Sequence, residues 1–196
     1  MRQIALPLDE LRFGSATSLI ITESNAAIVA ALGQFGDWPG RCAILAGPPR
    51  SGKSLLARYF ASHSGGLVIE DAESAGEETL FNAWNRAQVG GPPLLLISRF
   101  APPDWNIALA DLRSRLGAAL LLQIPPPDDE LLGQLIQKHL GDRGTAIGME
   151  ALAYASRRIE RSYSAIEQFA RDANALALAE SGPVNLARVK RLLNQD

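Results

Sequence analysis

One segment of eight residues, Gly47-Pro48-Pro49-Arg50-Ser51-Gly52-Lys53-Ser54, constrains this chain more than any other feature. It matches G-x-x-x-x-G-K-[ST], a loop whose backbone N–H groups surround phosphate oxygens. In this pattern Lys53 reaches the β and γ phosphates, and Ser54 holds Mg²⁺ through its hydroxyl. Residues 42–46 before the loop are apolar, as in a strand, and residues 53–62 have helical spacing. This order places phosphates at a helix N-terminus, so we expect a nucleoside di- or triphosphate to bind.

The composition excludes several classes of protein. The formal net charge is −2, so the chain lacks the basic excess that usually accompanies nucleic acid as the main partner. No apolar stretch approaches the roughly 18 residues of a membrane span. The single cysteine, Cys42, cannot form an internal disulfide. We therefore expect a cytoplasmic protein of one domain, or of one domain with a small appendage, with no strong direct DNA binding and no membrane partner.

The spacing of apolar residues predicts an α/β core followed by helices alone. Up to the prolines at 125–127, continuous apolar runs alternate with amphipathic segments, which is typical of a parallel sheet buried on both faces. After the prolines only helical spacing continues. The predicted strands are 42–46, 67–71, 94–98 and 119–124. The predicted helices are 23–35, 53–62, 77–88, 107–116, 129–140, 149–159, 162–179 and one from 185 onward.

Polar residues at the ends of two predicted strands complete the expected site. Glu70 and Asp71 end the strand that follows the helix after the phosphate loop. P-loop NTPases carry an Mg²⁺-binding carboxylate at this place, and often a second that orients water. Glu70 and Asp71 are therefore the predicted metal ligands beside Ser54, although two solvated strand-end acids are the alternative interpretation. Ser98 ends the neighbouring strand, where a polar residue can contact the γ-phosphate or the attacking water.

Several arginines are candidates for a role in phosphoryl transfer. Arg113 and Arg115 lie in a predicted helix, from which an arginine finger can reach the γ-phosphate of a neighbouring subunit. On the residues alone, an ordinary solvated helix face is slightly favoured. In the C-terminal helices Arg157, Arg158 and Arg161 are similarly open to two interpretations, since one of them could fold onto the phosphates.

Together these features resemble the AAA+ ATPase core with its helical lid, and more narrowly the DnaA branch of replication initiators. The resemblance covers roughly residues 12–196. Residues 19–25 resemble the DnaA segment that packs on the adenine, which implies a contact from Ile21. Residues 112–116 resemble the arginine-finger box of that family, with Arg115 at the finger position.

The lid offers one further resemblance. Arg161, ahead of Ser162-Tyr163-Ser164-Ala165-Ile166, best resembles the sensor arginine that opens a lid helix in the family. The nucleotide-binding residues that the resemblance implies are those of the phosphate loop together with Leu55, Ile21 and Arg161.

The N-terminal leader narrows the resemblance. Gln3-Ile4-Ala5-Leu6-Pro7-Leu8 resembles the hexapeptide that binds the sliding clamp. Gln3 would make the polar contact, Ile4, Leu6 and Leu8 would supply aliphatic groups, and Pro7 would keep the peptide extended. Ahead of a DnaA-like core without a helix-turn-helix domain, this leader resembles that of the Hda family, the regulatory inactivators of DnaA.

What that family implies is a regulator rather than an ordinary ATPase. Such a protein binds ADP, docks on the DNA-loaded β clamp and promotes hydrolysis of ATP held by DnaA, with Arg115 offered in trans. Its own hydrolysis of ATP is expected to be weak or absent, and a homodimer is a further possible partner state. The expected domains are a clamp-binding leader at 1–11, an AAA+ core at 12–126 and a helical lid at 127–196.

The chain departs from the AAA+ pattern in two respects. Only residues 61–66 separate the helix after the phosphate loop from the acidic strand, so we expect the sheet (order 5-1-4-3-2) to lack its edge strand. The acidic pair reads Glu-Asp instead of Asp-Asp or Asp-Glu. Two other functions stay open. A stand-alone P-loop kinase or ATPase would carry several arginines in a mobile lid, and a helicase-loader-like protein would need a basic or aromatic surface for single-stranded DNA.

Overall fold

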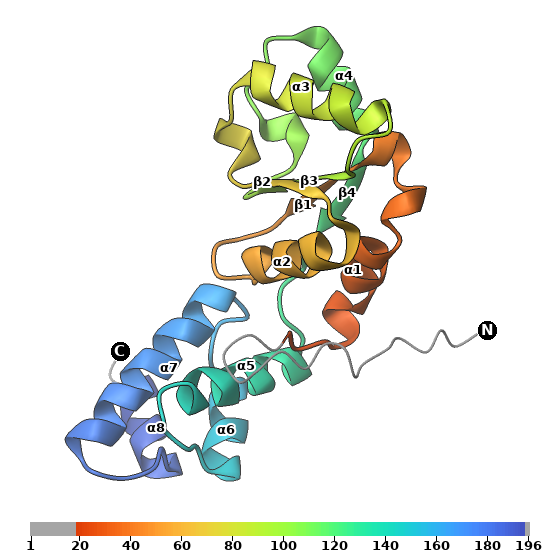
Figure 1. The fold of residues 1–196 in the computed structure, drawn as a ribbon. Coiled ribbons are helices and arrows are strands. Elements are labelled where there is room, and N and C mark those ends of the chain that lie inside the picture. The colour runs from red at the N-terminus through yellow and green to blue at the C-terminus, as the bar shows by residue number, and fades with distance from the viewer. Residues whose placement is uncertain (1–18, 195–196) are drawn as a thin grey trace. The chain divides into compact units, whose positions relative to one another are not determined.

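The computed structural model describes residues 19–194, so the predicted clamp-binding segment Gln3–Leu8 lies outside the described residues. The chain forms two compact units (Figure 1). One is Asn25–Pro125, which holds the sheet and the phosphate loop. The other consists of the chain from Pro126 onward together with the segment that ends at Ser24.

The first unit is built on a parallel sheet of four strands in the order β2-β3-β1-β4. The strands are β1 (Cys42–Ala46), β2 (Leu67–Ile69), β3 (Leu94–Ser98) and β4 (Leu120–Gln123). Every residue of β1 and β3 is buried, which explains why the sequence shows continuous apolar runs there. The prediction of a parallel α/β sheet is confirmed, and the sheet ends at β2, as the short connection at 61–66 predicts.

Helices cover both faces of this sheet. Helices α1 (Glu23–Gly33) and α2 (Lys53–Ser64) lie on one face, and α3 (Glu77–Gln88) and α4 (Ala110–Ala118) lie on the other (Figure 1). Side chains alternate between the faces, and Cys42, Ile44 and Leu96 belong to the core that also contains Trp84 and Trp105. Burial raises the pKa of the Cys42 thiol to about 12, so this thiol stays protonated and unreactive.

Strand β2 is shorter than predicted because the backbone turns sharply after it. The sequence predicts a strand to residue 71, but β2 ends at Ile69. Asp71 has a φ of 47°, in the left-handed region and outside the extended conformation of a regular strand. A short 3-10 helix, Ala72–Ser74, follows at once.

Helices α4 and α6 also differ from their predicted bounds. The sequence predicts a helix from residue 107, but α4 begins at Ala110. The Glu77 carboxylate accepts hydrogen bonds from the N–H groups of Ala108 (2.6 Å) and Leu109 (2.9 Å), which holds this segment outside the helix. Helix α6 (Met149–Ser156) ends three residues before its predicted end at 159. There the N–H groups of residues 158 and 159 both donate to the carbonyl of residue 155, in a tight turn.

The second unit is helical. It contains α5 (Asp129–Gly141), α6, α7 (Tyr163–Ala179) and α8 (Leu186–Leu193), around a core that includes Leu132, Ile136, Leu140, Ile166 and Phe169. Between residues 126 and 194 the only β pairing is an isolated bridge between Ile147 and Val184. None of the helices in the described part of the chain is both long and apolar enough to cross a membrane.

Asp128 joins residues 22–24 to the start of α5. Its Oδ1 accepts a hydrogen bond from the N–H of Leu131 at 2.6 Å, which caps the helix. Its Oδ2 accepts hydrogen bonds from the Thr22 hydroxyl at 2.9 Å and from the Ser24 N–H at 3.0 Å. Burial raises the pKa of this carboxyl, but the hydrogen bonds from Leu131, Thr22 and Ser24 lower it more, so the pKa lies below its ordinary value of 3.8.

We predict that Asp128→Ala destabilises the protein by about 1–3 kcal/mol at pH 7, because a helix cap and two further hydrogen bonds are lost. A lowered pKa stabilises the folded state above the unfolded-state pKa of about 3.9, and this stabilisation is lost as the pH falls through the folded-state pKa. The free energy of unfolding in urea should therefore differ more between the unchanged protein and Asp128→Ala at pH 7 than near pH 3.

Asp129→Ala is the matched control. Asp129 is the next residue along the chain and forms an exposed ion pair with Arg161 at 2.7 Å, which should contribute less than about 1 kcal/mol. Equal destabilisation by the two substitutions would contradict the role given to Asp128.

Candidate functional site

The phosphate loop leaves the sheet at the carboxyl end of β1. Strand β1 pairs with β3 so that Ala46 lies opposite Ser98, and the N–H of Gly47 donates to the carbonyl of Ser98 at 3.2 Å. Helix α2 begins at Lys53, directly after the loop. The N–H groups of Lys53 and Ser54 have no acceptor within the helix, since they belong to its first turn. A strand, a tight loop and a helix N-terminus together form an anion-binding arrangement.

Two glycines are required by this geometry. A Cβ atom on Gly47 would lie 2.9 Å from the Cβ of Ile124 and 3.2 Å from the Ser51 hydroxyl, closer than side chains normally pack. Gly52 has a φ of 84° where it precedes α2, a conformation that strains any other residue. The glycines of the motif therefore serve the backbone path of the loop.

The two prolines limit which N–H groups can face a phosphate. Pro48 and Pro49 have no backbone N–H, so the loop's donors come from the residues after them. The hydroxyl and the N–H of Ser51 both donate to the Pro48 carbonyl, at 2.8 and 3.4 Å, which closes the loop into a turn. The N–H groups that remain for a ligand are concentrated at Gly52–Ser54, next to the start of α2.

Lys53 lies folded back onto its own loop. Its ammonium donates to the carbonyls of Gly47 (2.6 Å) and Pro48 (2.8 Å), which leaves one N–H donor for another acceptor. Burial lowers the pKa of Lys53 below 10.5, and of the surrounding charges Glu73 opposes this effect most strongly. A phosphate would offer this cation a charged acceptor in place of two neutral carbonyls.

The acids after β2 are arranged differently from the sequence prediction. Glu70 and Asp71 are both exposed, in the turn between β2 and the following 3-10 helix. Glu73, which the strand-end pattern does not single out, has a side chain only 7% exposed. Its Oε1 accepts a hydrogen bond from the N–H of Arg99 at 3.2 Å. Its Oε2 is buried with no hydrogen-bond partner.

Ser98 is buried at the edge where the phosphate loop begins. Its side chain hydroxyl donates to the carbonyl of Phe100 at 2.9 Å, within the loop after β3. Its carbonyl accepts the hydrogen bond from Gly47 described above. The structure thus gives Ser98 a role in anchoring the phosphate loop, while its contact with a phosphate or water stays a prediction.

The oxygen groups at this edge suit a magnesium ion. Mg²⁺ prefers oxygen ligands and is usually held by one or two carboxylates with phosphates and water, rather than by an all-protein cage. Across residues 19–194 no three Asp, Glu, His or Cys side chains converge on one point, so no such cage is present there. The exposed hydroxyl of Ser54 and the unpartnered oxygen of Glu73 are compatible with a hydrated ion. Ligation by Ser54, Glu70 and Asp71 stays a prediction.

The remaining nucleotide-binding candidates divide between the two units. Leu55 lies in the first turn of α2, next to the loop. Ile21 and Arg161 belong to the helical unit, where Arg161 forms its ion pair with Asp129. Arg158 of the same unit stacks its guanidinium on Tyr154, 3.7 Å from the ring centre. Contacts of Ile21 and Arg161 with a nucleotide stay predictions.

Arg115 is held firmly on α4. Its guanidinium donates to both carboxylate oxygens of Asp111, at 2.9 and 2.8 Å, and to the side chain of Asn85 at 2.7 Å. The same group lies over the ring of Phe81, 4.7 Å from its centre. These contacts are with α3 and α4, on the sheet face opposite α2 (Figure 1). Arg113 instead donates to the carbonyl of Ile107 and so fixes the start of the helix.

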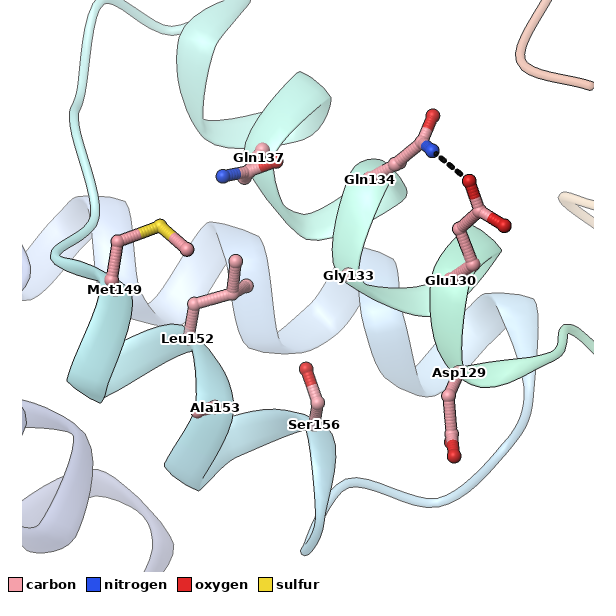
Figure 2. A pocket seen from close by; sticks show the side chains of 9 residues that line it. All are labelled: Asp129, Glu130, Gly133, Gln134, Gln137, Met149, Leu152, Ala153 and Ser156. Atoms are coloured by element: carbon pink, nitrogen blue, oxygen red, sulfur yellow. Dashed lines mark hydrogen bonds between the residues drawn. The ribbon is translucent and has the colours of Figure 1, made fainter. Parts of the chain in front are cut away.

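A hollow between α5 and α6 is a weaker candidate site. Figure 2 shows Met149 and Leu152 projecting from α6 toward α5. Glu130 and Gln134 at its rim are paired with each other at 2.9 Å. A ligand site normally has a few polar groups that converge on the ligand. Glu130 and Gln134 are engaged with each other and Asp129 with Arg161, so the phosphate loop remains the better candidate.

Comparison with known proteins relates the chain to a replication initiator. No protein-family model matches it. The chromosomal replication initiator protein DnaA of Thermomicrobium roseum is 28% identical over 135 residues, which cover 66% of this chain. The match spans 29% of the length of that DnaA.

Solved structures show the same fold. Domain III of DnaA from Thermotoga maritima has a TM-score of 0.72 at 16% identity, covering 89% of this chain and 93% of that one. The R170A variant of Thermotoga maritima RuvB has a TM-score of 0.67 at 19% identity, with 95% and 74% covered. A DnaA bound to AMPPCP and single-stranded DNA has a TM-score of 0.61 at 16% identity, with 83% and 66% covered. The chain therefore has an AAA+ fold, and its sequence similarity relates it to DnaA.

We predict that Lys53→Ala weakens the binding of ADP about 10- to 100-fold, because a charge-assisted hydrogen bond contributes about 1.5–3 kcal/mol. Without nucleotide, the Lys53→Ala variant should melt at nearly the same temperature as the unchanged protein, since Lys53 bonds only to carbonyls of its own loop. Fluorescence titration with a labelled ADP measures the affinity. Lys190→Ala, at an exposed position on α8, is the matched control. Unchanged affinity in Lys53→Ala would place the nucleotide away from this loop.

Proposed function

We propose that this chain is a nucleotide-binding regulator of replication initiation, which holds ADP at the phosphate loop and promotes hydrolysis of ATP bound to DnaA. The observation that carries the nucleotide site is the position of Lys53 at the start of α2, beside a loop whose N–H groups are left at the helix N-terminus. The bound AMPPCP of the similar DnaA structure supports a nucleotide in this fold.

Action on a partner's nucleotide is supported by the environment of Arg115. An arginine finger must be presented in a fixed orientation, because its guanidinium has to meet a γ-phosphate as charge develops there. Asp111 and Asn85 hold Arg115 through three hydrogen bonds, and the side chain is still 29% exposed. These contacts keep the guanidinium on the α3–α4 face, where a second molecule rather than the chain's own loop can supply the phosphate.

Weak intrinsic hydrolysis is part of the same proposal. The two acids that the sequence motif assigns to Mg²⁺ and water, Glu70 and Asp71, are exposed at a turn, and Asp71 has a left-handed backbone. Solvated carboxylates of this kind are less effective than preorganised groups in a water-excluded site. A regulator that keeps its nucleotide bound has no need of rapid turnover.

Docking on the sliding clamp rests on the leader alone. Gln3–Leu8 has the composition of a short extended peptide that anchors a glutamine and aliphatic groups in a preformed groove. Such docking would bring the protein to DNA-loaded clamps without a DNA-binding surface of its own, which agrees with the net charge of −2.

We predict that Arg115→Ala abolishes stimulation of ATP hydrolysis by DnaA while ADP binding is retained. Arginine fingers contribute on the order of 10³- to 10⁵-fold in comparable phosphoryl transfers, so hydrolysis should return to the rate of DnaA alone. Arg115→Lys should restore little of the stimulation of ATP hydrolysis, because a lysine cannot form the bidentate contact with Asp111. The measurement is phosphate release from ATP-loaded DnaA with added clamp and DNA.

The control is Arg86→Ala, which removes the same charge from an exposed position on the neighbouring helix α3. Arg86→Ala should stimulate ATP hydrolysis by DnaA as strongly as the unchanged protein does. Normal stimulation by a folded Arg115→Ala variant would contradict the finger assignment, and the absence of stimulation by the unchanged protein would contradict the proposed regulatory function.

We predict that the double substitution Gln3→Ala with Leu6→Ala abolishes clamp binding in a pull-down with purified clamp. The glutamine supplies the polar anchor and the leucine part of the apolar contact, so losing both removes most of the peptide's recognition. The variant should bind ADP normally, because the leader is separate from the phosphate loop in sequence. Clamp binding that survives the double substitution would show that the leader is not the docking segment.

A further inference from the structure

Glu73 has a buried carboxyl group whose hydrogen bonding is incomplete. Its side chain is 7% exposed, and Oε1 accepts from the N–H of Arg99 at 3.2 Å, with the Arg99 Nε 3.8 Å away. Within residues 19–194 its Oε2 is the one buried side-chain oxygen or nitrogen without a hydrogen-bond partner. Burying a carboxylate oxygen without a donor is strongly unfavourable, so this atom points to a ligand or water that supplies one.

Backbone pairing places Glu73 next to the anchor of the phosphate loop. Ser98, at the end of β3, accepts the hydrogen bond from Gly47 that begins the loop. The next residue, Arg99, donates its N–H to Glu73. Glu73 is therefore fixed one residue away from the contact that positions the loop, while its second oxygen is uncommitted.

The charge of Glu73 also acts on Lys53. Its ammonium uses two donors on loop carbonyls, and Glu73 is the charge that most strongly opposes the effect of burial on the pKa of Lys53. A carboxylate whose charge acts on the lysine of the phosphate loop would repel phosphate oxygens if no cation or water lay between them.

The neighbouring acids lack these properties. Glu70 and Asp71 are exposed to solvent in the turn before Glu73, so water already satisfies their oxygens. Mg²⁺ bound to a nucleotide keeps several of its waters, and each water can donate a hydrogen bond to a fixed carboxylate. Of the three acids, only Glu73 combines a fixed position with an uncommitted buried acceptor.

We propose that Glu73 is the positioning carboxylate of the nucleotide site: Oε2 accepts a hydrogen bond from a water of the Mg²⁺–nucleoside diphosphate complex. This rests on the proposed binding of nucleotide at the phosphate loop. Glu73 then sets how strongly Mg²⁺ promotes binding.

The test is the affinity for a fluorescent ADP, measured in excess MgCl₂ and again in EDTA, for the unchanged protein and Glu73→Gln. The substitution keeps the side chain's shape and the oxygen that accepts from Arg99, but replaces Oε2 with an NH₂ donor and removes the charge. Binding in EDTA should become tighter, since repulsion of the phosphates is removed. Binding in MgCl₂ should become weaker, so that the enhancement by Mg²⁺ falls about tenfold.

Tighter ADP binding in EDTA together with weaker binding in MgCl₂ distinguishes this role from a structural one, because a damaged fold weakens binding in both buffers. Glu78→Gln is the matched control, because it removes a solvated charge from the exposed first turn of α3 and should keep the full enhancement. Glu73→Asp keeps the charge and should retain part of the enhancement. Circular dichroism confirms that each variant is folded.

Three results would overturn the inference while leaving nucleotide binding intact. One is an unchanged Mg²⁺ enhancement in Glu73→Gln. Another is equal weakening in both buffers. The third is a loss of enhancement in Glu78→Gln as large as that in Glu73→Gln. If the unchanged protein binds no ADP in either buffer, the proposed nucleotide site fails, and the inference fails with it.

Discussion

The parallel pairing of β1 with β3 is the constraint on which the rest of the site depends. These two strands are buried on both faces, so their register is fixed by packing as well as by hydrogen bonds. The register sets Ala46 opposite Ser98, and the Ser98 carbonyl then receives Gly47. From this point the loop turns toward α2, and from the same edge Arg99 binds Glu73. The loop that carries Lys53 and the buried carboxylate of Glu73 are thus positioned by one pair of strands.

The parts of this fold that depend on local pattern could be predicted from the sequence. Continuous apolar runs identify all four strands; burial under helices on both faces explains them for β1 and β3, whereas the edge strands β2 and β4 are only partly buried. The phosphate loop can be recognised in the sequence because its backbone path requires glycine at two positions. Gly52 has a positive φ, and a side chain on Gly47 would collide with its neighbours. The proline run marks the place where strands cease, since Asn25–Pro125 form one compact unit.

The rest depends on contacts between residues far apart in the chain. The start of α4 is set by Glu77, some thirty positions earlier, which no local propensity reveals. The burial of Glu73 follows from the left-handed turn at Asp71 and from the Arg99 N–H, whereas a strand-end pattern selects Glu70 and Asp71. The sequence does show Glu73 as a third acid, four residues after the end of β2, and this was the only local sign of its role. The contacts of Arg115 with Asn85 and Phe81 likewise appear only once α3 and α4 are packed.

The account's central claim is that the loop before α2 holds the phosphates of a nucleotide. A crystal structure of the full chain with ADP and Mg²⁺ tests it most directly. The account predicts diphosphate density against the N–H groups of Gly52–Ser54, with the Lys53 ammonium moved from the carbonyls of Gly47 and Pro48 to a phosphate oxygen. ADP bound elsewhere, for example in the hollow between α5 and α6, with Lys53 still on those carbonyls, would contradict it.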